Sequence, residues 1–241
     1  MTLGSQFELL PMTVPTTHPT LLGTVTTPAG LRLLARKTLP AHAVEVRVDA
    51  LLAEKVPVAT IESALRDRRH PVLLTLRIPA EGGRHPWKLK ERRELYLRLL
   101  PLVEAIDLEL ATAGAMSTAL DEARRAGKTV VLSAHSIAKP ATPAQFEKWQ
   151  AQFQARPATI LKVAARIASW RDLQRLAALL VNHPAWPIAV MGLGPFAAQS
   201  RSVLTALGSR LVYGYLDAPA APGQPSAAEV AKSITALPDP G

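Results

Sequence analysis

Eight short apolar runs alternate along the chain with eight segments of helical pattern, and this alternation limits the fold more than any other feature. The runs are rich in β-branched residues and have the length of strands. The expected strands are Leu21–Thr26, Ala43–Val48, Val72–Arg77, Ala105–Leu110, Thr129–Ser133, Thr159–Val163, Ile188–Met191 and Leu211–Tyr215. Strands that alternate with helices in this way predict a parallel sheet with helices packed against it.

The segments between these runs have recognisable helix ends. Ser169 and Asp172 have the spacing of a capping box, Thr142-Pro143 offers a cap followed by a proline, and Gly127 stops a third helix. No Gly-rich phosphate-binding pattern follows the first strand, which argues against an open doubly wound sheet. The expected helices are Leu31–Thr38, Ile61–Arg69, Lys90–Leu99, Met116–Ala126, Pro143–Gln154, Trp170–Val181, Phe196–Leu207 and Ala227–Ala236.

A length of 241 residues and eight strand-helix pairs predict one (β/α)8 (TIM) barrel over residues 19–241. Residues 1–18 are rich in Pro and Thr, and we expect them to form a short irregular N-terminal extension. The chain has no cysteine, which excludes disulfides, thiolate nucleophiles and cysteine-bound metals. No apolar run approaches the roughly 18 residues of a membrane span, and no signal-peptide pattern opens the chain. We therefore expect a soluble, cytoplasmic protein without a membrane partner.

The formal net charge of +9 fits either a polyanionic partner or a small anionic substrate. The basic clusters at 66–69 and 88–93 contain acidic residues and fall in expected helices or at their ends. Aromatic residues make up only 5% of the chain and do not interleave with these clusters, so no stacking platform for nucleic acid is evident. The clusters are interpreted as solvated helix faces, and no nucleic-acid partner is expected.

In a barrel of this kind, chemistry takes place where the strands end and the following loops begin. The second strand ends in Glu45-Val46-Arg47-Val48-Asp49, and alternation along a strand would point its three charged side chains to one side. Such a set forms either part of an active site or an internal layer of ion pairs at the barrel mouth. The other strand ends add Arg77 with Glu81-Gly82-Gly83, Asp107 and Glu109, Ser133 and His135, Lys162, Ser200-Arg201, and Pro222-Gly223-Gln224.

Lys162 lies in the middle of an apolar strand, where an unpaired ammonium group is costly. Its side chain either reaches out to solvent or acts as a neutral amine that attacks a carbonyl. Charge repulsion from Arg77 and Arg201, together with desolvation, could supply the neutral form. A metal held by His135, Asp107 and Glu109 is the weaker alternative, since no second histidine is spaced to join them and several cations share the mouth.

Seven short motifs resemble, in this order, those of type I 3-dehydroquinate dehydratase, and their order and approximate spacing match from Glu45 to Gln224. They are Glu45-Val46-Arg47-Val48-Asp49, Thr75-Leu76-Arg77 with Glu81-Gly82-Gly83, Asp107-Leu108-Glu109, Ser133-Ala134-His135, Leu161-Lys162-Val163-Ala164, Met191-Gly192 with Ser200-Arg201, and Ala221-Pro222-Gly223-Gln224. The resemblance implies a (β/α)8 barrel that converts 3-dehydroquinate to 3-dehydroshikimate, in the shikimate pathway, through an imine and without a cofactor. Lys162 would match the Schiff-base lysine.

The same resemblance implies roles for the other site residues. His135 would match the proton-transfer histidine, and Glu81 the carboxylate that orients it. The residues that would match the substrate-binding groups are Glu45, Arg47 and Arg77 around the hydroxyls, and Arg201 and Gln224 at the carboxylate.

Two features depart from the family pattern. The segment from Met191 to Arg201 is about two residues longer than usual, which bears on the position of Arg201. Ala220 stands where many members have a serine, so one hydrogen bond to substrate would have to come from a backbone group or water.

Two other functions remain open from the residues alone. One is another Schiff-base barrel such as a class I aldolase, which Lys162 and the barrel would allow. The other is a basic non-catalytic barrel that binds an anion or a partner protein, which the net charge and the altered loops would allow. A homodimer is compatible with the fold, but no isolated apolar stripe marks an interface.

Overall fold

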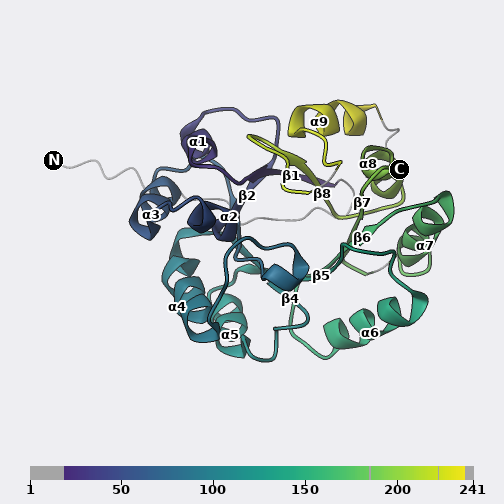
Figure 1. The fold of residues 1–241 in the computed structure, drawn as a ribbon, viewed down its shortest axis with the longest axis horizontal. Helices are drawn as coiled ribbons and strands as arrows, with labels where there is room; N and C mark the ends of the chain where they lie inside the picture. Colours follow the sequence, from purple (N-terminus) through teal and green to yellow (C-terminus); the bar gives the residue numbers. More distant parts are fainter. Residues whose placement is uncertain (1–18, 185, 222, 237–241) are drawn as a thin grey trace.

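The computed structural model describes residues 19–184, 186–221 and 223–236. Eight parallel strands follow one another around a barrel in the order β7-β6-β5-β4-β3-β2-β1-β8. At the seam between β7 and β8, the Arg210 N–H donates to the Ile188 carbonyl at 2.9 Å. The helices surround the strands on the outside (Figure 1). The predicted (β/α)8 barrel is therefore confirmed, whereas the predicted extension, residues 1–18, lies outside the described residues.

The strands start close to the predicted positions and differ mainly where they end. Their bounds are β1 Thr20–Val25, β2 Ala43–Arg47, β3 Val72–Thr75, β4 Ala105–Glu109, β5 Thr129–Ser136, β6 Ile160–Arg166, β7 Ile188–Leu193 and β8 Leu211–Tyr215. The strands β5, β6 and β7 run two or three residues further than expected. Their longer ends carry His135 and Arg166 toward the mouth of the barrel.

The main helices follow the strands as predicted. The α-helices are α1 Pro28–Leu31, α2 Val48–Ala53, α3 Val58–Arg66, α4 Leu89–Leu99, α5 Ser117–Arg125, α6 Pro143–Gln154, α7 Trp170–Val181, α8 Ala197–Ala206 and α9 Ala227–Thr235. Short 3-10 helices lie at η1 Arg32–Ala35, η2 Pro79–Glu81 and η3 Leu100–Leu102. No helix in the described part of the chain is long and apolar enough to cross a membrane.

The predicted helix ends are confirmed by their hydrogen bonds. The Thr142 and Ser169 side chains each accept from the backbone N–H three residues later, and both capping boxes are complete. Gly127 follows α5 with a φ of +66°, the left-handed conformation that ends many helices.

Two predictions about local structure were wrong. The predicted helix Leu31–Thr38 is replaced by the short helix α1 and the 3-10 turn η1. The alternation expected through Asp49 also fails, because β2 ends at Arg47 and α2 begins at Val48. Single-sequence patterns locate element ends only to within a few residues, so a strand that passes directly into a helix is easily read as one longer strand.

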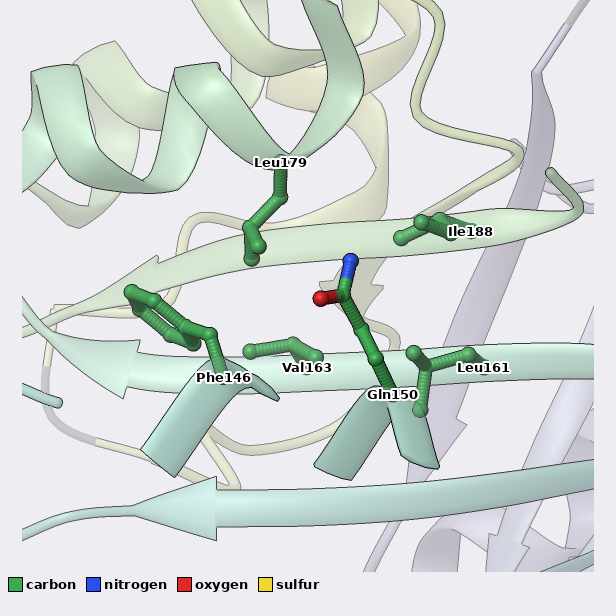
Figure 2. A pocket seen from close by; sticks show the side chains of 6 residues that line it. All are labelled: Phe146, Gln150, Leu161, Val163, Leu179 and Ile188. Atoms are coloured by element: carbon green, nitrogen blue, oxygen red, sulfur yellow. The ribbon is translucent and has the colours of Figure 1, made fainter. Parts of the chain in front are cut away.

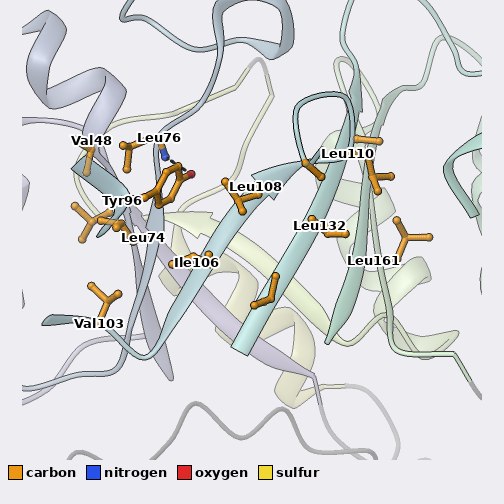
Figure 3. Packing of buried hydrophobic residues seen from close by; sticks show 14 of the residues in the cluster. Val48, Leu74, Leu76, Tyr96, Val103, Ile106, Leu108, Leu110, Leu132 and Leu161 are labelled. Carbon is orange, nitrogen blue, oxygen red and sulfur yellow. Dashed lines mark hydrogen bonds between the residues drawn. The ribbon is translucent and has the colours of Figure 1, made fainter. Parts of the chain in front are cut away.

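The barrel buries apolar side chains in two layers. The outer layer lies between strands and helices and includes Leu74, Ile106 and Leu132 (Figure 3). The inner layer fills the barrel itself with alternate residues of the same strands, such as Leu73 and Val131. Because neighbouring residues of a strand point to opposite faces, strands buried on both faces are apolar almost throughout. The few charged residues in them are therefore concentrated at the mouth.

Tyr96 on α4 joins two strands from the outside. Its hydroxyl accepts from the Leu76 N–H at 3.1 Å and donates to the Asp107 carbonyl at 2.5 Å. Figure 3 shows the ring standing beside Leu76, with this first hydrogen bond dashed. The bridge ties the end of β3 to β4 at the level of the charged residues.

We expect Tyr96→Phe to lower the free energy of unfolding by about 2 kcal/mol, because it leaves a buried N–H and a buried carbonyl without their partner. Denaturant unfolding measures the change. Tyr215→Phe is the matched control, since the Tyr215 hydroxyl makes no side-chain hydrogen bond to the described residues, and it should change stability by less than about 0.5 kcal/mol. Equal losses in the two variants would contradict the bridge.

Candidate active site

A cavity of about 210 Å³, open to solvent, lies at the end of the barrel where the strands terminate. It brings together all eight residues predicted for the site: Glu45, Arg47, Arg77, Glu81, His135, Lys162, Arg201 and Gln224. Residues from distant parts of the sequence meet here because parallel strands present their carboxyl ends at one edge.

A second hollow lies outside the barrel wall and has a different character (Figure 2). It is lined by Phe146 and Gln150 of α6, Leu161 and Val163 of β6, Leu179 of α7, and Ile188 of β7. Gln150 supplies the polar atoms of an otherwise aliphatic and aromatic lining, so this hollow lacks the charged groups that chemistry would need. The mouth of the barrel is the candidate active site.

The Lys162 amino group is buried and enclosed on three sides. It donates to Asp107 Oδ2 at 2.9 Å, and Glu45 Oε1 lies 3.6 Å away. The ring of Tyr213 lies beneath it, with its centroid 4.1 Å from Nζ. The side chain therefore stays in the barrel and does not reach out to solvent. From the sequence we expect cations close to this amine, but carboxylates and an aromatic ring surround it in the structure.

Two threonines orient Glu45. Thr24 donates to Oε2 at 3.1 Å and Thr75 to Oε1 at 3.0 Å, from the strands on either side. Both hydroxyls are buried, so their hydrogen bonds are hardly weakened by water. Sequence reasoning missed Thr24, although its register with Glu45 on paired strands could have indicated it.

Arg77 is clamped between carboxylates. Its guanidinium faces Asp107 at 3.0 Å and Glu109 at 3.3 Å, and donates to Ser133 Oγ at 2.6 Å. Burial opposes the charged form of Arg77, but these carboxylates outweigh it and hold its pKa well above the usual range. The pKa of Asp107 is correspondingly held below its usual range, by Arg77 and Lys162 against the effect of burial.

Arg47 forms a two-pronged ion pair with Asp49, at 2.9 and 2.8 Å. Asp49 is in the first turn of α2, and it also accepts from the backbone N–H groups of Arg77 and Arg84. The pair thus fastens the end of β2 to the loop that follows β3. In that loop, a Cβ atom at Gly83 would lie 2.0 Å from the Arg77 carbonyl oxygen, so only glycine fits this close approach of the backbone.

The predicted basic cluster at 88–93 contains a buried residue. Arg92 is 1% exposed, and it pairs with Glu109 behind Arg77. Its interpretation as part of a solvated helix face was therefore wrong. The signal was present, because Arg92 precedes Leu95, Tyr96 and Leu99 at the spacing of one helix face, and those three are buried.

His135 and Glu81 form a close pair. His135 Nδ1 lies 2.7 Å from Glu81 Oε2, which also accepts from the His135 backbone N–H at 3.1 Å. Burial raises the pKa of Glu81 to about 7, and Glu109 and Asp107 add to that effect while Arg77 opposes it. Burial and the positive charge of Arg77 lower the pKa of His135 well below 6.5. At neutral pH the imidazole is therefore uncharged, with Nδ1 oriented by Glu81 and Nε2 available to a substrate.

Arg201 is buried and has no carboxylate partner among the described residues. Its guanidinium donates to the carbonyls of Gly192 at 2.6 Å, Ala197 at 3.2 Å and Tyr213 at 3.3 Å. Burial lowers its pKa to about 10, so it remains charged at neutral pH. Its Nη1 also lies 3.3 Å from Ser200 Oγ. A buried cation that meets neutral oxygen atoms but no carboxylate is suited to bind an anion from the cavity. The longer loop before α8 does not remove Arg201 from the site.

Gln224 lies beside the position where the family pattern is altered. Its Oε1 accepts from the Ala220 N–H at 2.7 Å, and its Nε2 donates to Thr24 at 3.4 Å. The amide is thus held in the cavity by the backbone of its own loop. No group of three or more acidic or histidine side chains placed to hold a metal ion occurs in the described part of the chain.

Comparisons with known proteins agree with this geometry. The model of the type I 3-dehydroquinase family matches residues 24–237. The 3-dehydroquinate dehydratase of Methanosarcina acetivorans is 32% identical over 212 residues, which cover 82% of this chain and 86% of that protein.

Solved structures give the same result. The structure of the Enterococcus faecalis 3-dehydroquinate dehydratase superimposes with a TM-score of 0.72 at 26% identity, covering 82% of this chain and 89% of that one. The structure from Geobacillus kaustophilus has a TM-score of 0.80 at 22% identity, covers 91% of both chains and supports the fold. With a family model that spans most of its length and a close relative along four-fifths of it, the chain belongs to the type I 3-dehydroquinase family.

Proposed function

We propose that this chain dehydrates 3-dehydroquinate to 3-dehydroshikimate through an imine on Lys162, without a cofactor, as a step of the shikimate pathway. The observation that carries the proposal is one cavity that contains three features: a buried lysine, a histidine-glutamate pair and a buried arginine without a carboxylate partner. Relatives named 3-dehydroquinate dehydratase match over most of the chain, which supports this choice of substrate.

The substrate is an anion with several hydroxyl groups, and the cavity offers a group for each part. Arg201 binds the carboxylate, for which its guanidinium is suited in charge and in shape. Gln224 is placed in the same part of the cavity. Glu45, Arg47 and Arg77 bind the hydroxyls, and their own ion pairs and hydrogen bonds hold them in place.

Imine formation keeps the charge at Lys162 constant. Once the amino group has given up a proton, the nitrogen lone pair forms a bond to the ketone carbon. That proton and one more from the nitrogen pass to the ketone oxygen, which leaves as water. Ammonium and ketone thus give a protonated imine and water, with one positive charge on nitrogen before and after. Asp107 and the Tyr213 ring, which contact this nitrogen, serve as partners to both cations.

His135 then moves the proton. Its Nε2 removes a proton from the carbon next to the imine. The electron pair of that C–H bond moves toward the positively charged nitrogen, which gives an enamine. The enamine returns these electrons and expels the hydroxyl group, which leaves as water after it takes a proton from His135. One water then hydrolyses the product imine, which releases 3-dehydroshikimate and returns the Lys162 amine. The lowered pKa of His135 suits the first step, because it keeps the imidazole unprotonated at neutral pH.

The other functions considered from the sequence have less support. Membership of the family favours a dehydratase over a class I aldolase. A non-catalytic barrel does not account for the buried pair of His135 and Glu81 at the cavity. An absorbance assay for the conjugated enone product separates the cases, since turnover at ordinary enzyme concentration rules out a binding-only function. Cytoplasmic location, a homodimer and the lack of a nucleic-acid partner stay predictions.

We expect borohydride added together with 3-dehydroquinate to leave a reduced adduct on Lys162, because it traps the imine. Intact-mass and peptide mass spectrometry locate the adduct. Lys162→Met should abolish it, whereas Lys148→Ala, at an exposed position on α6, should retain it. A folded wild-type protein without an adduct would exclude the imine mechanism.

We expect His135→Ala to form the same trapped adduct and to lose turnover by a factor of about 10²–10⁴, the usual contribution of a general acid-base group. Stopped assays with mass spectrometry measure both quantities in one sample. Turnover close to that of the wild type would remove His135 from the proton transfers.

The pH dependence of kcat/KM should follow the protonation of the Glu81 carboxylate. Above a pH of about 7 its carboxylate accepts the Nδ1 proton and leaves Nε2 free to act as a base. Below that pH Glu81 is protonated and can donate to Nδ1, which places the ring proton on Nε2 and blocks the base. We therefore expect kcat/KM to fall as the pH drops through about 7.

The amide in Glu81→Gln does not titrate, so this fall should disappear and leave only one at lower pH, where His135 itself is protonated. Glu91→Gln is the control, since Glu91 is an exposed carboxylate that faces His85. An unchanged midpoint in Glu81→Gln would assign the titration to another group.

A further inference from the structure

Arg92 has no role in the mechanism above, although it is among the most deeply buried charges of the protein. It extends inward from α4, donates from Nε to the Leu76 carbonyl at 2.8 Å and from Nη1 to Thr112 Oγ1 at 3.0 Å. Its Nη2 pairs with Glu109 Oε2. A buried charge on a helix that otherwise contributes apolar side chains to the core needs a reason.

Glu109 divides its two oxygens between Arg92 and the cavity side. Oε2 faces Arg92 and Thr112, while Oε1 accepts from the Ile78 N–H at 3.0 Å and lies 3.3 Å from Arg77 Nη1. Arg92, Glu109 and Arg77 therefore form a continuous chain of alternating charges from the helix layer to the wall of the cavity.

Without Arg92, the negative charge around Arg77 would exceed the positive charge. Arg77 already faces Asp107 at 3.0 Å, so Glu109 is a second carboxylate on the same guanidinium. Lys162 pairs with Asp107 and with Glu45, which adds one cation and one carboxylate to the same cluster. Without Arg92, three carboxylates would therefore meet only two cations, which leaves a net negative charge beside a cavity that receives an anionic substrate. Arg92 supplies the missing positive charge from the opposite side of Glu109.

We propose that Arg92 is a positioning residue for substrate binding: it neutralises Glu109 from behind and so leaves the positive charge of Arg77 available to the substrate. The inference rests on the proposed function, since it takes Arg77 as a group that contacts substrate. A purely structural role would instead depend on the hydrogen bonds of Arg92 to Leu76 and Thr112, and charge would not matter.

The test compares Arg92→Met, Glu109→Gln and the double variant, with KM and kcat measured beside the unfolding midpoint. Arg92→Met should raise KM by about tenfold or more, because it adds an uncompensated buried negative charge next to Arg77, and should lower kcat by a smaller factor. The double variant removes both charges and should bring KM back to within about threefold of the wild type, even though the hydrogen bonds of Arg92 stay lost.

Two further variants keep the result interpretable. Arg92→Lys retains the charge and should hold KM near the wild-type value, which covers the case in which Arg92→Met does not fold. Arg98→Met is the matched control, because Arg98 lies on the same helix and forms an ion pair with Glu62 at the surface, at 2.7 Å. It should leave KM unchanged.

A second readout needs no substrate. The positive charge of Arg77 lowers the pKa of His135, so an over-neutralised Arg77 should let the His135 titration midpoint rise in NMR spectra of Arg92→Met. The double variant should restore it. The other titratable or charged groups that act on His135 are constant across the series: Glu81, Lys162, Asp107 and Arg47.

The outcomes separate the two proposals. An inactive wild type whose His135 midpoint still rises in Arg92→Met and returns in the double variant would overturn the proposed function and keep the role of Arg92. An active wild type in which KM and the midpoint are the same in Arg92→Met, or in which the double variant is as poor as the single one, would overturn the role of Arg92.

Discussion

The site depends on the pairing of charges that have been taken out of water. Burying an isolated charge is costly, and the cost is offset only when an opposite charge and hydrogen bonds meet it at close range. Among the buried side chains of the barrel mouth, four carboxylates meet four cations. The carboxylates are Glu45, Asp49, Asp107 and Glu109, and the cations are Arg47, Arg77, Arg92 and Lys162.

This pairing leaves two features for chemistry. Arg201 faces carbonyl groups and the Ser200 hydroxyl but no carboxylate among the described residues, and in the proposed function the anionic substrate supplies the missing negative charge. Burial shifts the His135-Glu81 pair toward uncharged forms: it lowers the pKa of His135, which leaves the imidazole unprotonated at neutral pH, and it raises the pKa of Glu81 to about 7. The remaining groups are held by threonine, serine and backbone partners, so the site is largely formed before a substrate enters.

Much of the fold and of the site could be predicted from the sequence. The spacing of apolar residues and the helix caps predicted the barrel. The polar residues at and after the strand ends predicted Lys162, His135 and the other site residues that the cavity brings together. Arg92 was missed because a charged residue in a polar segment is usually solvated, and Asp49 was placed on a strand because a helix starts without a break. Glu81 ends the 3-10 helix η2, and no local pattern places it against His135; the family resemblance implied this pair, and the structure shows it at 2.7 Å.

By itself, the sequence determined the order of the elements and the chemical types of side chain at the strand ends. Both follow from local rules, namely the spacing of apolar residues and the signals that start and stop helices. Tertiary structure alone decided which charges meet. The partners of Lys162 come from β2, β4 and β8, and those of Glu109 from the end of β3 and from α4. The free energy of a buried charge depends on neighbours within a few ångströms, and the number of residues between two positions does not give their distance in space.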